Sequence, residues 1–538
     1  MQLRYTARVL PFLLAAGAFA ADPLPTNVPS ANHRIAGIAA PNNLSPELFE
    51  SIAAQGSNAL ENPSALVTFY GYDNNGPMVP TTTGSRVEAT KTEPDKNTYL
   101  ILKGQTGADP LYDYGTHFLF QGHELGLAGN NVHGYITRIN LDADAAHRVT
   151  LMADQDVNGQ PLPNIDGSTW YPFSQHLLFT AEGSLGGGVW QATLDVPSKV
   201  ESLTGIIGQG GYEGIQADAQ GRLIIVEDVG GTTSNFAKRP NSYLYRFLPV
   251  DPSDLKKGGK LQALQLTSHA DPSRPIYFDF FASADAHILS QDVKDMHTYG
   301  IVFDTTWVTI HDTAVNGTAP FNAITAAKAA HATPFKRPEN GQFRPGSNFG
   351  EFVFDETGDT DNRTQAGGTY GGFGAIFKLV LNGDRGRLSL VYNAPDAVHA
   401  GFDNCAFWDA DHIVFVEDAG DTLHGQRDAL DSAWLFDLNT NYANAGTQPI
   451  RILAEGRDAS ATLDTVISGA GFTGTFNNEG DNEITGWHLS DGNPTVNGLL
   501  GSKIPKPFQE GWRLFFTQQH GDNFTWEILS KDSIKAGN

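Results

Sequence analysis

The sequence is poor in cysteine and in basic residues. A single cysteine, Cys405, occurs in 538 residues. One thiol cannot form a disulfide within the chain, so the hydrophobic core, with or without bound metal ions, has to stabilise the fold. The chain carries 35 Lys and Arg against 60 Asp and Glu, a formal net charge of −25. This charge repels the phosphates of nucleic acids and anionic lipid surfaces, so we expect neither as a partner.

Long hydrophobic runs and several catalytic motifs are also missing. Beyond the N-terminal segment, no stretch reaches the about 18 apolar residues of a membrane-spanning helix. The sequence has no G-x-S-x-G elbow, no P-loop and no paired cysteine motif. Gly371-Gly372-Phe373-Gly374 is rich in glycine but lacks the strand-then-helix setting of a dinucleotide site. We therefore expect no membrane partner and no nucleophilic serine chemistry.

The N-terminus has the pattern of a secretory signal peptide. Arg4 and Arg8 precede an apolar run over residues 9–16, and Ala18-Phe19-Ala20 follows as a small-x-small cleavage pattern. The arginines are not adjacent, which favours the general secretory route over the twin-arginine route. We expect residues 1–20 to be removed and the protein to be secreted or periplasmic. The alternative is a short buried helix.

Short apolar strands separated by turn residues dominate the rest of the chain. Hydrophobic residues make up 40% of the sequence, which also holds 58 Gly and 29 Pro. Helical periodicity is confined to residues 45–54 and the alanine-rich residues 325–332. This pattern predicts an all-β protein.

One unit recurs along the chain: a strand with a polar, usually acidic, end, then a turn containing glycine, then a second strand. Six copies occur, at residues 117–140, 176–194, 222–247, 352–379, 412–436 and 513–528. Such repetition predicts a six-bladed β-propeller with helical and loop insertions. We expect a single domain over 21–538, with an N-terminal strap over about 21–95 and an insertion over about 251–346. The alternatives are an array of β-sandwiches or a coincidence of common hairpins.

The acidic strand ends predict a metal site. In a propeller, carboxylates at the same end of each inner strand would form a ring around one mouth of the channel. Like charges this close repel strongly unless a cation bridges them or some stay protonated. Oxygen ligands favour Ca²⁺ over zinc or copper. The alternative is that these acids are solvated hairpin residues.

Three local patterns stand out as candidates. Glu124 follows His123 but has no second histidine at the spacing of a zinc protease. Glu213 lies between glycines, which allow a close approach of the backbone to a ligand. In Arg337-Pro338-Glu339, the proline fixes the backbone between a cation and an anion, and arginine can bind a phosphate through two parallel hydrogen bonds. Each could equally be an ordinary surface loop or turn.

Several segments together resemble the PhoX-type alkaline phosphatases, which are secreted bacterial proteins of propeller fold. The similarity runs from about residue 88 onward. It is carried by Gly210–Glu213, Gly221–Gly230, Tyr243–Pro249, Arg337-Pro338-Glu339, Asp403-Asn404 with His412–Asp418, and Glu483-Ile484-Thr485-Gly486.

The resemblance implies a phosphoric monoester hydrolase with a cluster of calcium and iron in the propeller channel. It implies that Arg337 binds the phosphate and that Glu339 binds metal beside it, so these two are the expected catalytic residues. The metal ligands that it implies are Glu124, Glu182, Glu213, Glu339, Asp403 and Glu483.

Two departures from the family bear on the metal. The iron-bridging cysteine of the family immediately precedes a glutamate at a strand end, and here Ala181 stands in that place, before Glu182. The family's usual twin-arginine signal is absent as well. Calcium is therefore expected, whereas the presence of iron stays open.

Three functions remain as alternatives. The first is a metal-dependent hydrolase, most simply a monomer, that acts on a small-molecule phosphate ester. The second is a non-catalytic propeller stabilised by calcium, which binds a ligand or a partner. The third is a calcium-dependent esterase or lactonase.

Overall fold

The structure is a computed structural model. It describes residues 24–34, 39–73, 92–125, 134–182, 187–360, 367–457, 483–519 and 521–532. The predicted signal peptide lies outside these residues. Among them, no helix combines the length and the apolar character that crossing a membrane requires.

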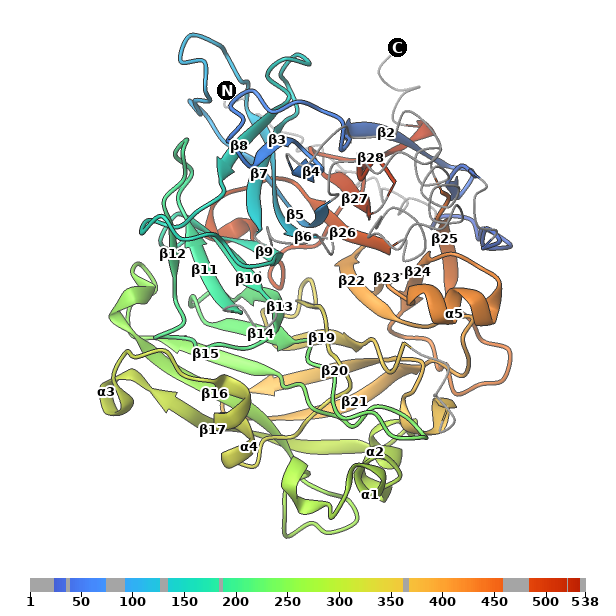
Figure 1. Cartoon of the computed structure of the whole chain (residues 1–538). Helices are drawn as coiled ribbons and strands as arrows, with labels where there is room; N and C mark the ends of the chain where they lie inside the picture. The colour runs from blue at the N-terminus through green and yellow to red at the C-terminus, as the bar shows by residue number, and fades with distance from the viewer. Residues whose placement is uncertain are drawn as a thin grey trace, which may run out of the picture.

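Antiparallel sheets form the framework of the described chain (Figure 1). The first consists of β5 (Thr92–Ile101), β6 (His117–Leu125), β7 (Tyr135–Asn140) and β8 (Val149–Ala153). The second consists of β9 (Ile165–Tyr171), β10 (His176–Ala181), β11 (Gly188–Ala192) and β12 (Val200–Ser202). In both sheets the strands follow each other in chain order, as in a meander.

A nine-stranded sheet joins the next two meanders. The first is formed by β13 (Tyr212–Ala217), β14 (Leu223–Glu227), β15 (Tyr245–Pro249), β16 (Gly259–Leu266) and β17 (Val302–Asp312). The second is formed by β18 (Gly341–Phe343), β19 (Glu351–Glu356), β20 (Ala375–Asn382) and β21 (Arg385–Asn393). β17 pairs with β21 and fuses them into one sheet.

The two remaining large sheets unite the ends of the described chain. One consists of β22 (Phe402–Phe407), β23 (His412–Glu417), β24 (Ser432–Asp437), β25 (Ile450–Ala454) and β1 (Asn43–Leu44). The other consists of β26 (Glu483–Ser490), β27 (Arg513–Gln519), β28 (Phe524–Ser530) and β2 (Leu48–Ala54). A small hairpin, β3 (Val67–Phe69) with β4 (Tyr72–Asp73), forms a separate two-stranded sheet.

The first strand of each meander faces a common axis. β5, β9, β13, β18, β22 and β26 contact one another in that order, and β26 contacts β5 again, so the contacts form a closed ring. Because each meander starts at this ring, the beginnings of the six strands lie at the same end of the axis. The fold is therefore all-β with a propeller-like arrangement, as the repeat predicted.

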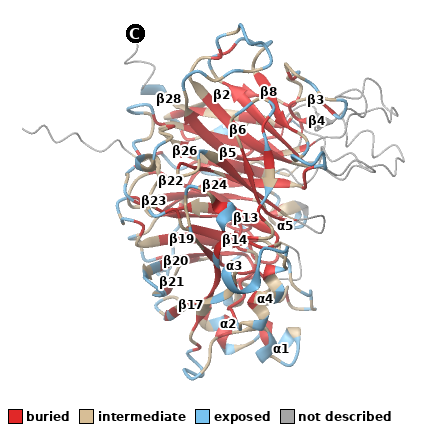
Figure 2. Cartoon of the chain, turned by 90° about the vertical axis from the view of Figure 1, so that its left-hand side faces the viewer, coloured by how far each residue is buried: buried red, intermediate tan, exposed pale blue. Residues whose placement is uncertain are grey.

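Both faces of most strands are covered by neighbouring sheets. All five residues of β14, Leu-Ile-Ile-Val-Glu, are buried, and so are all but the first of β23, His-Ile-Val-Phe-Val-Glu. Strands covered on both faces read as continuous apolar runs rather than as alternating ones. Figure 2 shows the result, with buried residues along the strands and exposed ones mainly in the connections.

Helices are short and few among the described residues. They are η1 (Leu255–Lys257), η2 (Phe278–Phe280), α1 (Ala284–Ile288), α2 (Gln291–Met296), α3 (Thr313–Asn316), α4 (Ala323–Ala329), η3 (Gly367–Tyr370), α5 (Gly420–Arg427) and η4 (Val496–Gly498). The predicted alanine-rich helix is confirmed as α4, which begins at its N-cap Asn322, whose side chain accepts from the Thr325 N–H. The predicted helix over residues 45–54 is wrong, because most of that segment forms β2 and pairs with β28. Local periodicity could not show a partner almost 480 residues away.

The six predicted hairpins all exist, but they are the second and third strands of each meander. They correspond to β6–β7, β10–β11, β14–β15, β19–β20, β23–β24 and β27–β28. The inner strand comes before each hairpin, and the repeat did not include it. The predicted strap, about 21–95, contains β1–β4 and the start of β5, and the predicted insertion, about 251–346, contains β16–β18 and α1–α4. These domain limits remain a prediction.

Candidate metal centre

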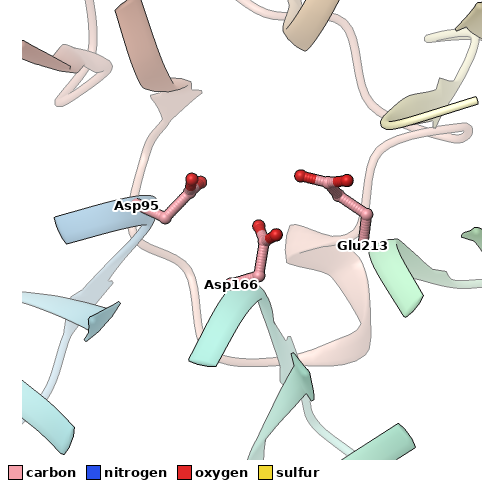
Figure 3. A group of neighbouring side chains, drawn as sticks. All are labelled: Asp95, Asp166 and Glu213. Carbon is pink, nitrogen blue, oxygen red and sulfur yellow. The ribbon is translucent and has the colours of Figure 1, made fainter. Parts of the chain in front are cut away.

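The beginnings of three neighbouring inner strands carry acidic residues that point toward one another. Asp95 is on β5, Asp166 on β9 and Glu213 on β13 (Figure 3). One carboxylate oxygen from each lies within 4.8 Å of the other two. The acids at the beginnings of these inner strands thus lie close together at one end of the axis, as expected for a propeller.

The ends of the second strands bring further acids to the same place. Glu124 is near the end of β6, Glu182 directly follows β10, and Asp228 directly follows β14. Because the second strand runs antiparallel to the inner one, its last residues lie beside the first residues of the inner strand. Glu124 and Glu182 form a second group with Asp166, and Glu182 and Asp228 form a third with Glu213, each within the same 4.8 Å limit.

A fourth group extends the cluster across the axis. Glu213, Glu339 and Asp403 have oxygens within 4.8 Å of one another. The four groups share members and so form one continuous carboxylate cluster. Among the described residues its eight members are Asp95, Glu124, Asp166, Glu182, Glu213, Asp228, Glu339 and Asp403.

Glycines after two of these acids let the inner strands approach closely. A Cβ on Gly167, next to Asp166, would lie 2.1 Å from the carbonyl oxygen of Glu213. A Cβ on Gly214, next to Glu213, would lie 2.9 Å from the carbonyl oxygen of Glu339. The backbone N–H of Gly214 donates to that carbonyl at 2.7 Å. Only glycine permits this spacing, so it sets how far apart the acids stand.

Burial and mutual repulsion raise the pKa of these carboxyl groups. Burial is the largest cause for Asp166, Glu182 and Glu213, whose pKa values rise well above the ordinary range, and neighbouring acids add to it. For Glu124, burial together with the charges of Glu93 and Asp95 raises the pKa to about 8. Bound cations would lower these pKa values again and favour the charged forms.

Two members of the cluster also carry oxygens without a hydrogen-bond donor. Oε1 of Glu124 and Oδ1 of Asp166 are buried and have no hydrogen-bond partner among the described residues. A buried acceptor that lacks a donor costs free energy, typically about 1–3 kcal/mol. An all-oxygen set of this density fits Ca²⁺, which takes 6–8 oxygen ligands. The residues present therefore fit the predicted cation.

Arg337 borders the cluster and is tightly paired. Its Nε and Nη2 donate to the two oxygens of Asp228, both at 2.8 Å, and Nη2 also donates to Oε1 of Glu339 at 3.0 Å. Its Nη1 donates to Oγ1 of Thr360 at 3.0 Å. Burial alone would lower the pKa of Arg337, but the charges of Asp228 and Glu339 raise it well above its ordinary value. The guanidinium is thus a permanent positive charge at the edge of the cluster.

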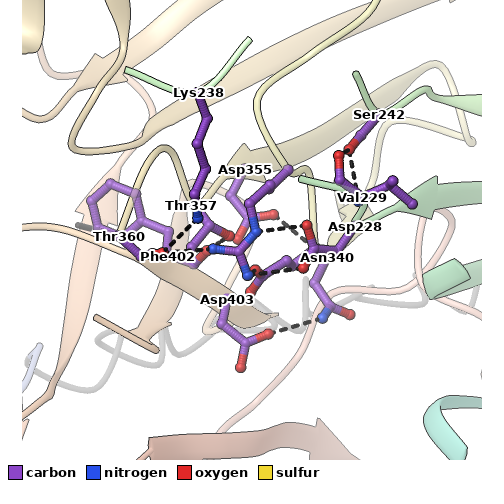
Figure 4. A network of polar contacts seen from close by, with 12 residues as sticks. Asp228, Val229, Lys238, Ser242, Asn340, Asp355, Thr357, Thr360, Phe402 and Asp403 are labelled. Atoms are coloured by element: carbon purple, nitrogen blue, oxygen red, sulfur yellow. Dashed lines mark hydrogen bonds and ion pairs between the residues drawn. The ribbon is translucent and has the colours of Figure 1, made fainter. Parts of the chain in front are cut away.

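Other polar groups hold the surroundings of Arg337 in place (Figure 4). Lys238 donates through Nζ to Oγ1 of Thr360 at 3.4 Å. Asn340 donates from its side chain to Asp403 at 3.4 Å and from its backbone to Asp355 at 2.8 Å. Lysine, threonine and arginine therefore gather on the same side of the cluster.

Five of the predicted metal ligands lie together, namely Glu124, Glu182, Glu213, Glu339 and Asp403. Glu483 belongs to none of the four groups. Burial raises the pKa of its carboxyl well above the ordinary range, and Asp418, Asp403, Asp95 and Glu124 add to the shift, so it lies within electrostatic reach of the cluster.

Sequence reasoning missed Asp95, Asp166 and Asp228. A signal for the first strands did exist: an apolar residue, an acid and then a small or amide residue. It reads Ile165-Asp166-Gly167, Tyr212-Glu213-Gly214 and Phe402-Asp403-Asn404. The repeat that predicts the propeller consists of the hairpins alone, which begin one strand later.

Ala181 and Cys405 both lie in the core. Ala181 is fully buried, pairs with Gly188 and packs in the cluster of apolar side chains that includes Ile165. Cys405 is buried on β22, and burial raises the pKa of its thiol far above the ordinary value. Within the described residues, no group that could hold a metal ion includes a cysteine.

Comparison with known proteins gives a fold but no family. No protein-family model matches the sequence, and no curated protein matches it. The chain is similar to the solved structure of PhoX from Pseudomonas fluorescens in complex with vanadate, a transition state analogue. That match has 10% identity and a TM-score of 0.54 over 94% of this chain and 98% of the other.

Two further solved structures are more distant. TolB from Acinetobacter baumannii matches at 9% identity and a TM-score of 0.28 over 82% of this chain and 64% of the other. Trypanosoma rangeli sialidase in complex with sialic acid matches at 8% identity and a TM-score of 0.31 over 92% of this chain and 60% of the other. The comparison with PhoX supports a PhoX-like propeller fold. At 10% identity it supports the fold alone.

Proposed function

We propose that the chain is a metal-dependent hydrolase of phosphoric monoesters, with calcium held by the carboxylate cluster at the mouth of a six-bladed propeller. The observation that carries the proposal is the contact between this cluster and Arg337. Within the described residues, eight carboxylates converge there, five of them buried and three half-buried, and the guanidinium at their edge holds Asp228 and Glu339. An anionic substrate would meet bound cations and an arginine rather than bare carboxylates.

Each side chain has a separate task in this proposal. The eight cluster carboxylates, together with Glu483, would hold the cations, and bound calcium would supply positive charge for phosphate oxygens and for the charge that develops on them. Arg337 would orient the phosphate. Asp228 belongs both to a candidate metal group and to the Arg337 pair. A metal ion that binds Asp228 would therefore weaken its hydrogen bonds with Arg337, so that the guanidinium could donate to the substrate instead.

Export and a simple assembly complete the proposal. We infer a single domain over residues 21–538, with the strap and insertion described above and a signal peptide over residues 1–20 that directs it to the periplasm or the exterior. The closed order of six inner strands supports the blade count. The substrate would be a small-molecule phosphate ester bound by a monomer, without nucleic acid or membrane.

The direct test is turnover of p-nitrophenyl phosphate by the purified full-length protein with added Ca²⁺ and with EDTA. We expect metal-dependent hydrolysis that vanadate inhibits. Arg337→Ala should lower kcat/KM by about 100-fold or more, as expected when a charged group loses its partner in a buried site. No turnover under any metal condition would sink the proposal.

A matched control separates the role of Arg337 from the loss of an ion pair. Arg513 forms a similar two-bond pair with Glu527, at 2.7 and 2.6 Å, on β27 and β28. Arg513→Ala removes an ion pair that does not belong to the carboxylate cluster, and it should leave kcat/KM within about twofold of the parent. Equal losses in the two variants would mean that Arg337 acts only through stability.

A non-catalytic, calcium-stabilised propeller is the second candidate, and Ala181 is the observation that favours it. Ala181 offers no ligand atom where the resembling family has its iron-bridging cysteine. Elemental analysis of protein from its native compartment would show calcium without iron and without hydrolysis. A panel of carboxylic esters and lactones would reveal the third candidate, a calcium-dependent esterase or lactonase.

A further inference from the structure

A second cavity lies farther along the same inner strands. Where the carboxylate cluster occupies the beginnings of the strands, this cavity is lined by later residues such as Thr98, Ser168, Gln216, Gln342 and His488. Its volume is about 80 Å³. At about 15 Å³ for each water-sized group, that leaves room for roughly five such groups. It is a small cavity bordered by residues of five of the six inner strands.

The connection between β26 and β27 lines one wall of this cavity. η4 and the residues after it contribute Gly498, Leu499 and Leu500, and Trp512 completes the wall. Nε1 of Trp170, itself a lining residue, donates to the carbonyl of Pro494 at 2.7 Å. The backbone N–H of Asn348 donates to the carbonyl of Gly501 at 2.7 Å. The connection is therefore anchored on both sides of the cavity.

The charge of this cavity is opposite to that of the rest of the channel. Among the described residues that line it, Lys96 alone has a formal charge, and none is an aspartate or glutamate. Lys96 is only 3% exposed, and its Nζ donates at 3.3 Å to the carbonyl of Cys405. An ammonium group has three donors. This single long hydrogen bond leaves Lys96 with donors to offer a ligand.

Neutral N–H groups accompany the lysine. Oε1 of Gln342 accepts from the backbone of Phe407 at 3.1 Å, so its NH₂ points the other way. Nε2 of His488 accepts from the backbone of Tyr99 at 3.2 Å, which places the proton of the neutral ring on Nδ1. Gln216 makes no side-chain hydrogen bond within the described part of the chain. One cation and several donors thus face a cavity that also has apolar walls.

We propose that this cavity binds a small organic monocarboxylate. Its carboxylate would accept from Lys96, Gln216 and Gln342, and its apolar part would lie against Leu100, Trp170 and Leu499. One ammonium balances one negative charge. The cavity lacks the arginine or second cation that a phosphate dianion calls for.

The opposing explanation is that Lys96 serves only as a counter-charge for the acids above it. Burial raises the pKa of Asp95 and of Asp403, and the charge of Lys96 partly offsets this in both. A counter-charge role requires no ligand in the cavity, and the side chain of Gln216 would not contribute to it. The two explanations therefore differ in what a change at Gln216 does.

The test is calorimetric titration of the full-length protein with butyrate, with butyramide as the neutral isostere and with inorganic phosphate. We expect butyrate to bind with a dissociation constant of about 1 mM, within reach of a ligand of this size, and butyramide and phosphate to bind at least tenfold more weakly. Gln216→Leu keeps the volume but removes the amide, and should weaken butyrate by about tenfold. Lys96→Met should abolish binding.

Controls keep this result separate from the proposed hydrolase. Gln191→Leu removes an amide that bonds to Glu201 on the neighbouring strand, outside the cavity, and should leave butyrate binding unchanged. Gln216→Leu should retain the parent's activity on p-nitrophenyl phosphate, because Gln216 touches none of the carboxylate groups. Equal binding of butyrate and butyramide, or butyrate binding that Gln216→Leu leaves intact, overturns the proposal. Absence of butyrate binding overturns it too, even if Lys96→Met fails to fold.

Discussion

Buried acids between the sheets and buried acids in the channel have different surroundings, and only those in the channel resemble a metal site. Between the sheets, Glu417 is fully buried, but its oxygens accept from the backbone of Ala400 and Ser432 and from the indole of Trp434, at 2.9–3.0 Å. In the channel, Asp166 is equally buried and its Oδ1 has no donor among the described residues. Burial alone therefore does not mark a metal ligand. What distinguishes the channel is that its carboxylates form groups of three whose oxygens lie within 4.8 Å of one another.

Adjacent residues separate the two roles. Glu417 ends β23 and Asp418 follows it, just as Glu227 ends β14 and Asp228 follows it. Side chains alternate in direction along a strand, so the first acid of each pair turns between the sheets and the second toward the axis. Glu227 receives hydrogen bonds from the backbone of Tyr243 and the hydroxyl of Tyr245. One strand end can thus supply a structural acid and a channel acid together.

Removal of cations tests the comparison most strongly. The channel acids should depend on bound calcium, whereas Glu417 should not. Ligand saturation at 100 times the dissociation constant stabilises by about 2.7 kcal/mol per site, so loss of two sites should lower Tm by about 5 °C in a domain of this size. Differential scanning calorimetry with EDTA, then with excess Ca²⁺, measures this, with Mg²⁺ as the control. An unchanged Tm would mean that the cluster holds no cation in the native protein.

A pair of substitutions should separate the two regions. Glu417→Gln removes one of the two carboxylates paired with the buried Arg427, at 3.1 Å, and leaves Asp431 at 2.6 Å, so it should destabilise by about 1–3 kcal/mol. Metal content should not change. Asp166→Asn should lower the calcium content and slightly stabilise the metal-free protein, because it removes a repelling charge. Elemental analysis and denaturant unfolding check both variants. Loss of calcium from Glu417→Gln would contradict the distinction between structural acids and channel acids.

The pH dependence of the metal-free protein should follow the channel acids. Burial and neighbouring charges raise the pKa of Glu124 to about 8 from an ordinary value of 4.5. Between these values the folded state holds a proton that the unfolded state has released. The stability from this group is therefore complete below pH 4.5 and is lost as the pH rises through 8.

Thermal unfolding with EDTA should thus give a lower Tm at pH 8.5 than at pH 5.5, by several degrees. With saturating Ca²⁺ the difference should shrink or reverse, because calcium binds the deprotonated forms. If the metal-free protein is more stable at pH 8.5 than at pH 5.5, deprotonation of the channel acids does not destabilise the folded state, and this prediction is wrong.

The sequence predicted the fold class and most of the cluster for a physical reason. Strands covered on both faces leave continuous apolar runs, and those runs end in acids that can be read directly, as at Glu124 and Glu182. The inner strands are harder to predict from the sequence because they lack a continuous apolar run. For example, β5 reads Thr-Glu-Pro-Asp-Lys-Asn-Thr-Tyr-Leu-Ile. Asp95 thus looked like part of a polar strap. Pairing between β2 and β28 depends on distant segments and leaves no local trace.

Spacing within the channel provides the smallest and most local test. Gly167→Ala would place a methyl group 2.1 Å from the carbonyl of Glu213 and 2.6 Å from Oγ1 of Thr180. The two inner strands would have to separate, at a cost of about 1–3 kcal/mol. Because Asp166 and Glu213 share a metal group with Asp95, calcium affinity should fall as well.

Gly425→Ala is the matched control for this change. Gly425 lies in α5, where a Cβ would meet nothing within 4 Å. That variant should be neutral or more stable by up to about 1 kcal/mol, with unchanged calcium affinity. Calcium titration of both variants at equal temperature decides the matter. If Gly167→Ala loses stability but binds calcium as the parent does, the strands can separate without moving the acids. The glycines would then serve packing alone.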